Sequence, residues 1–571
     1  MKKILSFIFI LTVFVAGMRG QDIPQHISYT RIYDFLDEMA NEGYISLNSV
    51  AKPYSRALIA EKLLDLQKIE VELNVRQKDE LYFFLNEYAL EQYKMPDNDI
   101  PVALKDKFRI DLLPPVFTYK DTTFRARIQP LLGMNVYKNS KGSITQRWFG
   151  VDFQGMIGKN LSIYGSLRDI SSNGFGNARL SDYAYLTTQP GYQYKEPSDF
   201  SDSRGGVKYA WKWGSVGLVK DNIVWGDNYH GSNIISGRAP SFPMITLRIK
   251  PTDWFEMNYI HGWLVSNVRD SSKYYIENGT KIHYRNHNKF IAANIFTITP
   301  YRNFNFSFGN AIIYAENNIQ PAYLLPIAFY KSIDHTLTKG IATENQNSQM
   351  FLNISSRNIK HLHLYTSIFV DEFSLNRLKP SSSEKNPISY KIGGRLTNLP
   401  IENLSLTGEF TRTNIITYKH SIDVLPWTSN TYNLGHYLGD NAQEIFFSVG
   451  YKPIRGLDLS LNFTSAKHGN EYEYLRRVSS ADAIKKIISQ PFMQDVIWKN
   501  TSVEFKALYE IYNNIYATLN IENSNIQTFD AVSDPIAGEV RMTTDEAMKY
   551  YTPAFMQGKN TTIMVGLSFG F

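Results

Sequence analysis

The sequence contains no cysteine, and beyond its N-terminal segment it has no apolar run long enough for a membrane-spanning helix. The first absence excludes disulfides, thiol chemistry and a lipid anchor on a cysteine. The second excludes a chain that crosses a membrane on helices. The net charge of +6 over 571 residues is small, so the composition indicates no nucleic-acid-binding surface.

Aromatic residues, by contrast, are abundant, with 37 Tyr and 34 Phe. Residues 561–571 show how they are used, because apolar residues there occupy every second position and small or polar residues the positions between. A period of two predicts a β-strand with one greasy face. Eleven residues at ~3.3 Å each, tilted near 45°, span the ~25 Å apolar band of an outer-membrane barrel.

Residues 1–20 have the pattern of a secretory signal peptide. Lys2 and Lys3 give a basic start, residues 4–16 are apolar, and Gly17 or Gly20 supplies a small residue before the cut. We therefore expect an exported protein that is not a lipoprotein, held together by packing and hydrogen bonds alone.

Residues 21–92 predict a small helical region on the periplasmic side of the barrel. Gly43 is a suitable stop for the first helix, Pro53 precedes the second, and Asn74 with Gln77 forms a capping box for the third. Residues 93–122 contain four prolines and predict a linker with one possible extra strand over Phe108–Leu112.

From Phe124 onward the chain repeats the two-residue alternation in segment after segment. In one example, Leu457, Leu459, Leu461 and Phe463 alternate with Asp458, Ser460, Asn462 and Thr464. Charged residues keep to the polar face, as expected if the other face meets lipid, where a mid-bilayer Lys or Arg costs roughly 2–4 kcal/mol. The polar face is then expected to line a wet lumen. A soluble β-sandwich strand would read almost the same, so the connections must decide.

The connections alternate between short and long. Short ones fall near residues 159–160, 214–215, 251–252, 301–302, 358–360, 400–402, 453–456 and 512–514, and long ones cover 171–205, 223–242, 266–287, 316–347, 372–387, 414–440, 467–500 and 524–560. Short periplasmic turns and long outer loops are the rule for bacterial outer-membrane barrels. We therefore predict an all-β transmembrane β-barrel of about 18 antiparallel strands over residues 123–571.

The segment Leu218–Leu247 contains the most specific motifs. Trp225-Gly226 is followed by a polar loop, by Ile-Ile-Ser-Gly-Arg-Ala over residues 234–239, and by Phe242-Pro243 before a strand. With Lys-Pro-Tyr-Ser-Arg-Ala over 52–57 and Tyr-Leu-Leu-Pro over 323–326, it resembles the Wzi-type capsule assembly family. The resemblance implies an eighteen-stranded outer-membrane barrel with periplasmic helices. It also implies a lectin-like, non-catalytic role in attaching or organising capsular or exopolysaccharide, although long loops at 467–500 and 524–560 depart from the family.

Six side chains of this segment are candidate ligand-binding residues: Trp225, Asp227, Asn228, Tyr229, His230 and Arg238. Aromatic faces stack on the apolar side of a sugar, while carboxylates and amides bind its hydroxyl groups. The alternative is that these residues pack the loop inside the barrel and satisfy buried backbone groups.

Other polar residues give weaker signals. His361 and His363 lie two apart but lack a third metal ligand, and Glu409 and Asp371 are expected to be neutralised by lumen cations such as Arg125, Arg127, Lys391 and Arg395. No phosphate loop or nucleophile motif is present, so we expect no metal, no cofactor and no catalysis. Helical signals near residues 480–488 and at Thr543 with Glu546 indicate structured loops that can cover the outer mouth.

Three functions remain open at this point. The leading hypothesis is a monomeric outer-membrane barrel, surrounded by lipids, that binds surface polysaccharide through its outer loops. The alternatives are a porin-like diffusion channel for small solutes and an outer-membrane enzyme that cleaves lipids or peptides.

Overall fold

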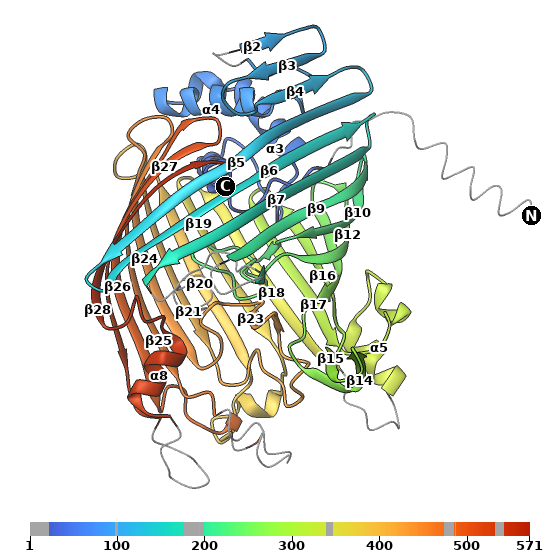
Figure 1. Cartoon of the computed structure of the whole chain (residues 1–571), viewed down its shortest axis with the longest axis vertical. Helices are drawn as coiled ribbons and strands as arrows, with labels where there is room; N and C mark the ends of the chain where they lie inside the picture. The colour runs from blue at the N-terminus through green and yellow to red at the C-terminus, as the bar shows by residue number, and fades with distance from the viewer. Residues whose placement is uncertain are drawn as a thin grey trace, which may run out of the picture.

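The computed structural model describes residues 22–97, 101–175, 193–194, 199–338, 346–472, 485, 487–531 and 542–570. Eighteen antiparallel strands close into a barrel (Figure 1), which confirms the predicted fold class. The expected signal peptide and the helical signal over residues 480–484 lie outside the described residues. The barrel strands are β5 (Phe124–Asn139), β6 (Gly142–Ile157), β7 (Leu161–Gly174), β9 (Asp199–Trp211), β10 (Gly214–Asp221), β12 (Phe242–Thr252), β13 (Phe255–Leu264), β16 (Lys289–Tyr301), β17 (Phe304–Tyr314), β18 (Gln346–Ile359), β19 (Leu362–Val370), β20 (Ile388–Thr397), β21 (Leu404–Thr413), β24 (Ala442–Tyr451), β25 (Leu457–Gly469), β26 (Val496–Tyr512), β27 (Ile515–Thr528) and β28 (Lys559–Phe569).

The barrel closes where its last strand meets its first. In β28, Ile563 pairs with Lys138 of β5 and Phe569 pairs with Leu132. Every other neighbouring pair is also antiparallel, so each barrel strand has hydrogen-bonded partners on both sides.

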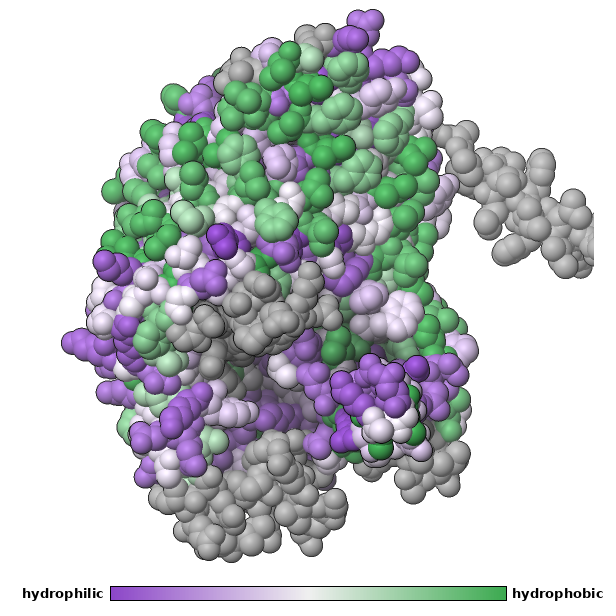
Figure 2. Space-filling model, viewed as in Figure 1, coloured by the Kyte–Doolittle hydropathy of each residue, from purple (hydrophilic) through white to green (hydrophobic). Residues whose placement is uncertain are grey.

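Most of the barrel exterior is apolar. Figure 2 shows this as a broad green area over β5, β6 and β7, with hydrophilic residues gathering toward the end that carries the long loops. Trp213, Trp254 and Tyr301 are exposed at the short turns, where membrane barrels carry a girdle of aromatic residues. Among the described helices, none has the length and apolar character needed to span a membrane.

The N-terminal helices α2 (Thr30–Asn41), α3 (Arg56–Gln67) and α4 (Val75–Glu87) form a bundle at the short-turn end of the barrel (Figure 1). Asn74 and Gln77 cap α4 reciprocally, as predicted. Ser46 donates to Asn303 in the turn between β16 and β17, at 2.9 Å, and Arg302 donates to the Gly43 carbonyl. Three short strands, β2 (Pro101–Leu104), β3 (Phe108–Asp111) and β4 (Phe117–Lys120), extend the sheet from β5, where the sequence predicted one.

The long connections carry the remaining described elements. Thr543 and Glu546 form the predicted capping box of α8. The N-terminal region also contains β1 (Ala51–Lys52) and η1 (Glu70–Glu72). The elements in the long connections are β8 (Gln193–Tyr194), β11 (Val224–Trp225), β14 (Arg269–Glu277), β15 (Lys281–Asn286), η5 (Pro321–Leu324), α5 (Tyr330–Thr338), η6 (Leu375–Leu378), β22 (Thr428–Ser429), β23 (Tyr432–Asn433) and α8 (Thr544–Tyr551).

The expectation of a wet lumen is wrong for one sector of the barrel. Along β13, β16 and β17 the inward residues include Ile260, Ile291, Ile295 and Ile313, all buried in one apolar cluster with residues of two long loops. The lumen here is filled with protein, so apolar side chains on the inner wall are buried without contacting lipid.

Candidate functional site

The segment of residues 222–241, which held the predicted ligand residues, folds into the barrel. Its strand β11 pairs with β1 of the N-terminal region, with Trp225 opposite Ala51 and Val224 opposite Lys52. Gly226 N–H donates to the Val50 carbonyl at 3.1 Å. We call residues 222–241, β1 and α2 together the inner plug, because a loop from one side and the N-terminal region from the other form a single unit.

Two of the six predicted residues are enclosed by protein. Trp225 is 2% exposed, and its ring packs edge-on against Phe351 of β18 with centroids 6.0 Å apart. Arg238 is 1% exposed, and its guanidinium lies over the Tyr432 ring at 4.9 Å. Both side chains therefore hold the loop in place in this structure.

The other four, Asp227 to His230, are half-buried and hydrogen-bonded to the barrel wall or to their own loop. Asp227 and Asn353 of β18 bind reciprocally, with the Asp227 N–H donating to the amide oxygen at 3.0 Å and the amide donating back to the carboxylate at 2.7 Å. The Asn228 amide donates to the Gly226 carbonyl at 2.8 Å. These contacts fix the loop while leaving part of each side chain open to the lumen.

Tyr229 connects the loop to α2 and to the wall. Its hydroxyl donates to Asp37 of α2 at 2.8 Å and lies 2.7 Å from Nδ1 of His363. The guanidinium of Arg395 stacks on its ring at 3.7 Å. The Tyr229 ring is therefore held by a cation on its face and by a carboxylate at its hydroxyl.

His230 lies beside two buried carboxylates. Its backbone N–H donates to Glu409 at 3.0 Å, its Nδ1 is 3.1 Å from Glu444, and its ring stacks on Phe446 at 4.0 Å. Burial disfavours the charged imidazolium, but the negative charge and hydrogen bond of Glu444 prevail, so the pKa of His230 is raised.

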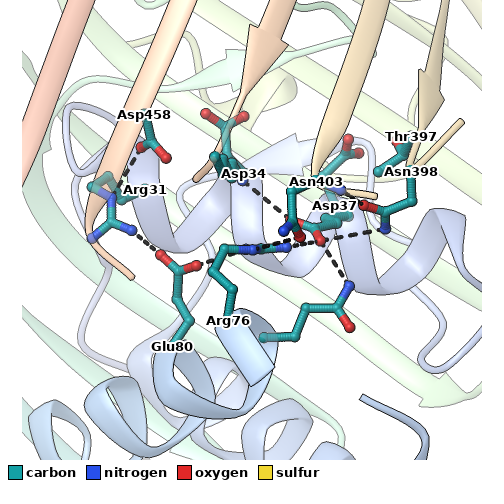
Figure 3. Close-up of polar contacts among 12 residues, drawn as sticks. Arg31, Asp34, Asp37, Arg76, Glu80, Thr397, Asn398, Asn403 and Asp458 are labelled. Atoms are coloured by element: carbon teal, nitrogen blue, oxygen red, sulfur yellow. Dashed lines mark hydrogen bonds and ion pairs between the residues drawn. The ribbon is translucent and has the colours of Figure 1, made fainter. Parts of the chain in front are cut away.

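The acidic face of α2 binds basic groups on the inner wall. Asp37 accepts from Arg357 at 2.7 Å, and Arg395 lies 3.2 Å from Asp34. On the same helix, Arg31 binds Asp458 of β25 at 3.0 Å (Figure 3). It also binds Glu510 of β26 at 2.7 Å. Helix α2 therefore closes the short-turn mouth of the barrel through ion pairs instead of apolar contact.

The carboxylates of α2 titrate far from their ordinary range. Burial alone would raise the pKa of Glu38, but the charges of Lys452 and Arg76 outweigh it and lower the pKa to about 2. The pKa of Asp37 is lowered further, because Arg357 and Arg395 overcome its burial. Both groups are held as carboxylates at neutral pH.

A second long loop fills the rest of this sector. Trp427 is fully buried, and its indole N–H donates to the Ile234 carbonyl at 3.0 Å. The Tyr418 hydroxyl donates to the Asn233 carbonyl at 2.7 Å. Residues 414–441 therefore pack on the inner plug from the loop end.

A cleft remains between the inner plug and the wall strands β7, β10, β12 and β13. It encloses about 700 Å³ of space between atoms, including its open mouth. Its lining combines aliphatic and aromatic side chains with a few charged groups, as is common in ligand pockets. Lining residues include Lys52, Tyr54, Tyr164, Asp221, Trp225 and Arg248.

The histidine pair noted in the sequence separates in the structure. His361 lies in a turn with φ 70° and binds Glu42 at 2.8 Å, whereas His363 faces Tyr229. Within the described ranges, no three His, Cys, Asp or Glu side chains are placed to hold a metal ion. The Lys391–Glu409 pair, 2.7 Å apart and buried, confirms the expected neutralisation of a lumen carboxylate.

Several residues at the centre of this site were missed from the sequence. Asp37, Arg357 and Glu444 were not selected, because a charge on a helix or on the polar face of a strand normally signals contact with water. The sequence pattern shows only that each of them lies on a polar face. The partners that they contact become neighbours only when the barrel folds.

Comparison with known proteins gives one family and several structures. The family model of capsule assembly protein Wzi matches residues 154–538. Wzi of Escherichia coli, described as an outer membrane protein involved in group 1 capsule assembly and a carbohydrate-binding β-barrel, has 10% identity and a TM-score of 0.54, covering 97% of this chain and 100% of its own. OccAB2 of Acinetobacter baumannii (7% identity, TM-score 0.42, covering 78% and 97%) and OprD of Pseudomonas aeruginosa (8%, 0.39, 78% and 94%) are more distant. No curated protein sequence matches the chain.

Proposed function

The chain belongs to the family of capsule assembly protein Wzi, and from this membership we propose that it attaches or organises capsular or exopolysaccharide at the cell surface. In this proposal it acts from the outer membrane, as a binder and not as an enzyme. The E. coli relative is described as carbohydrate-binding, and the proposal extends that property to this chain.

The filled lumen is the observation that favours a binder over a diffusion channel. Ion pairs from α2 cross the short-turn mouth, and the apolar cluster around Trp225, Ile234 and Trp427 occupies one side of the interior. A diffusion channel needs a continuous aqueous path, which these contacts oppose.

We assign the saccharide contacts on the lumen side to Asp227, Asn228, Tyr229 and His230, which keep part of their surface open. Carboxylate, amide and imidazole groups bind sugar hydroxyls, and they are already oriented by their bonds to the wall. Trp225 and Arg238, which are enclosed, support this segment in our proposal.

Deleting the gene and staining intact cells for polysaccharide tests the proposal. We expect cell-attached polysaccharide to fall and the material in the medium to rise, with recovery when the intact gene is returned. Unchanged cell-attached polysaccharide would contradict the proposed function. A glycan array with the purified protein would then identify the sugar that is bound.

A further inference from the structure

Strands β16 and β17 carry polar side chains on the outside of the barrel. Since their odd-numbered residues face the inner cluster, Asn294 and Asn310 point outward, and the two are directly paired across the strands. Tyr259 and His261 of β13 face outward next to them. Uncovered amides in contact with lipid would be strongly unfavourable.

The two asparagines lie at the depth of the membrane. Asn310 is six residues beyond Phe304, which adjoins the short turn, so at ~3.3 Å per residue and a tilt near 45° it stands ~15 Å above that end. The apolar band of such barrels is ~25 Å tall. Asn310 is therefore well inside the band.

Residues 315–338, which we call the outer flap, cover these side chains from outside. Asn294 donates to the carbonyls of Pro326 and Ala328 at 3.0 and 2.9 Å, and Asn310 accepts from the Tyr330 N–H at 2.8 Å. The Tyr259 hydroxyl donates to the Tyr323 carbonyl at 3.0 Å. The side-chain amides of the wall thus supply hydrogen bonds to an irregular backbone segment, which hydrocarbon chains could not do.

The opposite side of the outer flap is apolar and uncovered. Leu324, Leu325, Ile327 and Phe329 are 41%, 53%, 69% and 49% exposed. They continue the greasy exterior of β17, where Phe308 is exposed just below Asn310. A contiguous exposed apolar patch of this kind marks an interaction surface, and at this depth the neighbour is lipid.

The hairpin of β14 and β15 lies beside the outer flap (Figure 1). Its base begins next to Lys289, twelve residues above the short turn and so ~28 Å up, at the level of lipid head groups. It is joined to the flap by the Asn288 amide, which donates to the Asn317 carbonyl at 2.8 Å. Four cations outnumber two carboxylates over residues 269–286: Arg269, Lys273, Lys281 and Arg285 against Asp270 and Glu277.

We propose that the outer flap and this hairpin together bind a phosphorylated lipid of the outer leaflet. The acyl chains pack on Leu325, Ile327 and Phe329, while the anionic head group binds the exposed cations Arg269 and Arg285. The acyl chains are assigned to the flap because its apolar residues continue the lipid-facing wall. The head group is assigned to the hairpin because the hairpin carries excess positive charge above the flap. This site lies outside the barrel, on the other side of the wall from the proposed saccharide contacts.

The absence of cysteine makes the acyl-chain contact directly testable. An Ile327→Cys variant takes a single nitroxide label, whose collisions with oxygen and with a water-soluble nickel chelate are measured in phosphatidylcholine vesicles containing lipid A. We expect the collision rates of this label to match those of a label at Phe306, on the lipid-facing wall. They should differ from those of a label at Leu375, which is 72% exposed on an outer loop. A label open to nickel, or shielded from both reagents, overturns the proposal.

Head-group recognition is tested by charge removal. The variant R269Q/K281Q/R285Q should bind lipid A at least about tenfold more weakly by native mass spectrometry, since it removes three of the four cations of the hairpin. Binding of phosphatidylcholine should not change. The control R377Q/K379Q/K385Q removes three cations from another outer loop. Equal retention of lipid A by the two variants overturns the proposal.

Discussion

Glu409 is the residue on which the polar contacts of the inner plug converge. Its carboxylate accepts the backbone N–H groups of Tyr229 and His230 at 2.6 and 3.0 Å, the Lys391 ammonium at 2.7 Å, and the Tyr365 hydroxyl. A buried carboxylate that accepts two backbone N–H groups of one loop fixes the position of that loop. Its only cation within ion-pairing distance among the described residues is Lys391.

Replacing Lys391 with Met should loosen the loop while leaving the barrel intact. Removing one partner of a buried pair costs about 3–5 kcal/mol, because the other charge stays buried without compensation. Hydrogen exchange of the amides over residues 226–231 in reconstituted protein measures the effect, and heat-modifiable electrophoretic mobility reports the barrel.

Two further variants make this prediction specific. Lys281→Met removes one side of an exposed pair with Glu277 and should change stability by less than about 1 kcal/mol. The double variant K391M/E409Q should exchange more slowly than K391M, since no unpaired charge is left. Unchanged exchange in K391M would show that the pair does not hold the loop.

Trp225→Ala should destabilise the inner plug by about 3–5 kcal/mol, because it leaves a cavity against Phe351. Trp225→Phe should cost less. In both variants, molecules in which the inner plug stays folded should bind glycan with the same affinity. Titration calorimetry measures this affinity. A loss of affinity in Trp225→Phe with normal exchange rates would instead make the indole a ligand contact.

The sequence singled out the segment Leu218–Leu247, and the structure shows what its aromatic and polar side chains contact. Trp225, Tyr229 and His230 were selected because they lie in a polar loop between two strands, in the segment that carries the family resemblance. Their partners could not be found, since Asp227 binds a residue 126 positions away and Tyr229 one 192 positions away. Contacts of that separation depend on how the loop and α2 fold into the barrel, which no local pattern encodes.

Helix α2 shows how one element joins the two parts of the molecule. Its apolar face, with Phe35, Leu36 and Met39, packs in the helical bundle, and its acidic face binds the wall. The sequence predicted this helix, with Gly43 as its stop, and the structure has it over Thr30–Asn41. The acidic face would be read as solvated on any surface helix, so its docking could not be foreseen.

Acid should release α2 from the barrel. The folded pKa of Glu38, about 2, is below its ordinary 4.5, and that of Asp37 is also lowered, so their stabilisation is complete above pH 4.5 and is lost as pH falls toward 2. Nitroxide labels at Val71 and Tyr301, both exposed, would report a narrow distance distribution at pH 7 that broadens near pH 2.

The control for this titration is Glu38→Gln, which removes one titrating group. It should weaken docking at neutral pH and flatten the profile between pH 4.5 and 2. A distribution that stays narrow down to pH 2 in the unaltered protein would argue that apolar contacts, and not the carboxylates, hold the helix.

At the scale of the whole molecule, the barrel is a cylinder that is filled with protein along one side and crossed by the ion pairs of α2 at its short-turn mouth. Alternating residues and alternating connection lengths predicted its strand number and closure, because both follow from crossing a bilayer repeatedly. The sequence did not predict that protein fills one side of the lumen. It also did not predict that part of β16 and β17 has apolar residues facing inward and asparagines facing outward. A strand buried on both faces looks the same whether its coverings are lipid or protein.

Purified protein in planar bilayers should therefore show no large steady conductance. Replacing residues 226–236 with a short Gly-Ser linker should open a path and raise the conductance, whereas the same replacement over residues 374–382 of an outer loop should not. A large steady current from the unaltered protein would favour the diffusion channel.

The junction of β28 with β5 also sets a timetable. Until the eleven residues of β28 arrive, the wall is a curled sheet with two free edges, and its interior can still be reached from the side. Once that seam has formed, a charged group such as Asp37 of α2 can reach the inner wall only through one of the two mouths, because the closed wall has no opening at its side. The short-turn mouth, at which α2 lies, is therefore the entrance that remains for the N-terminal region.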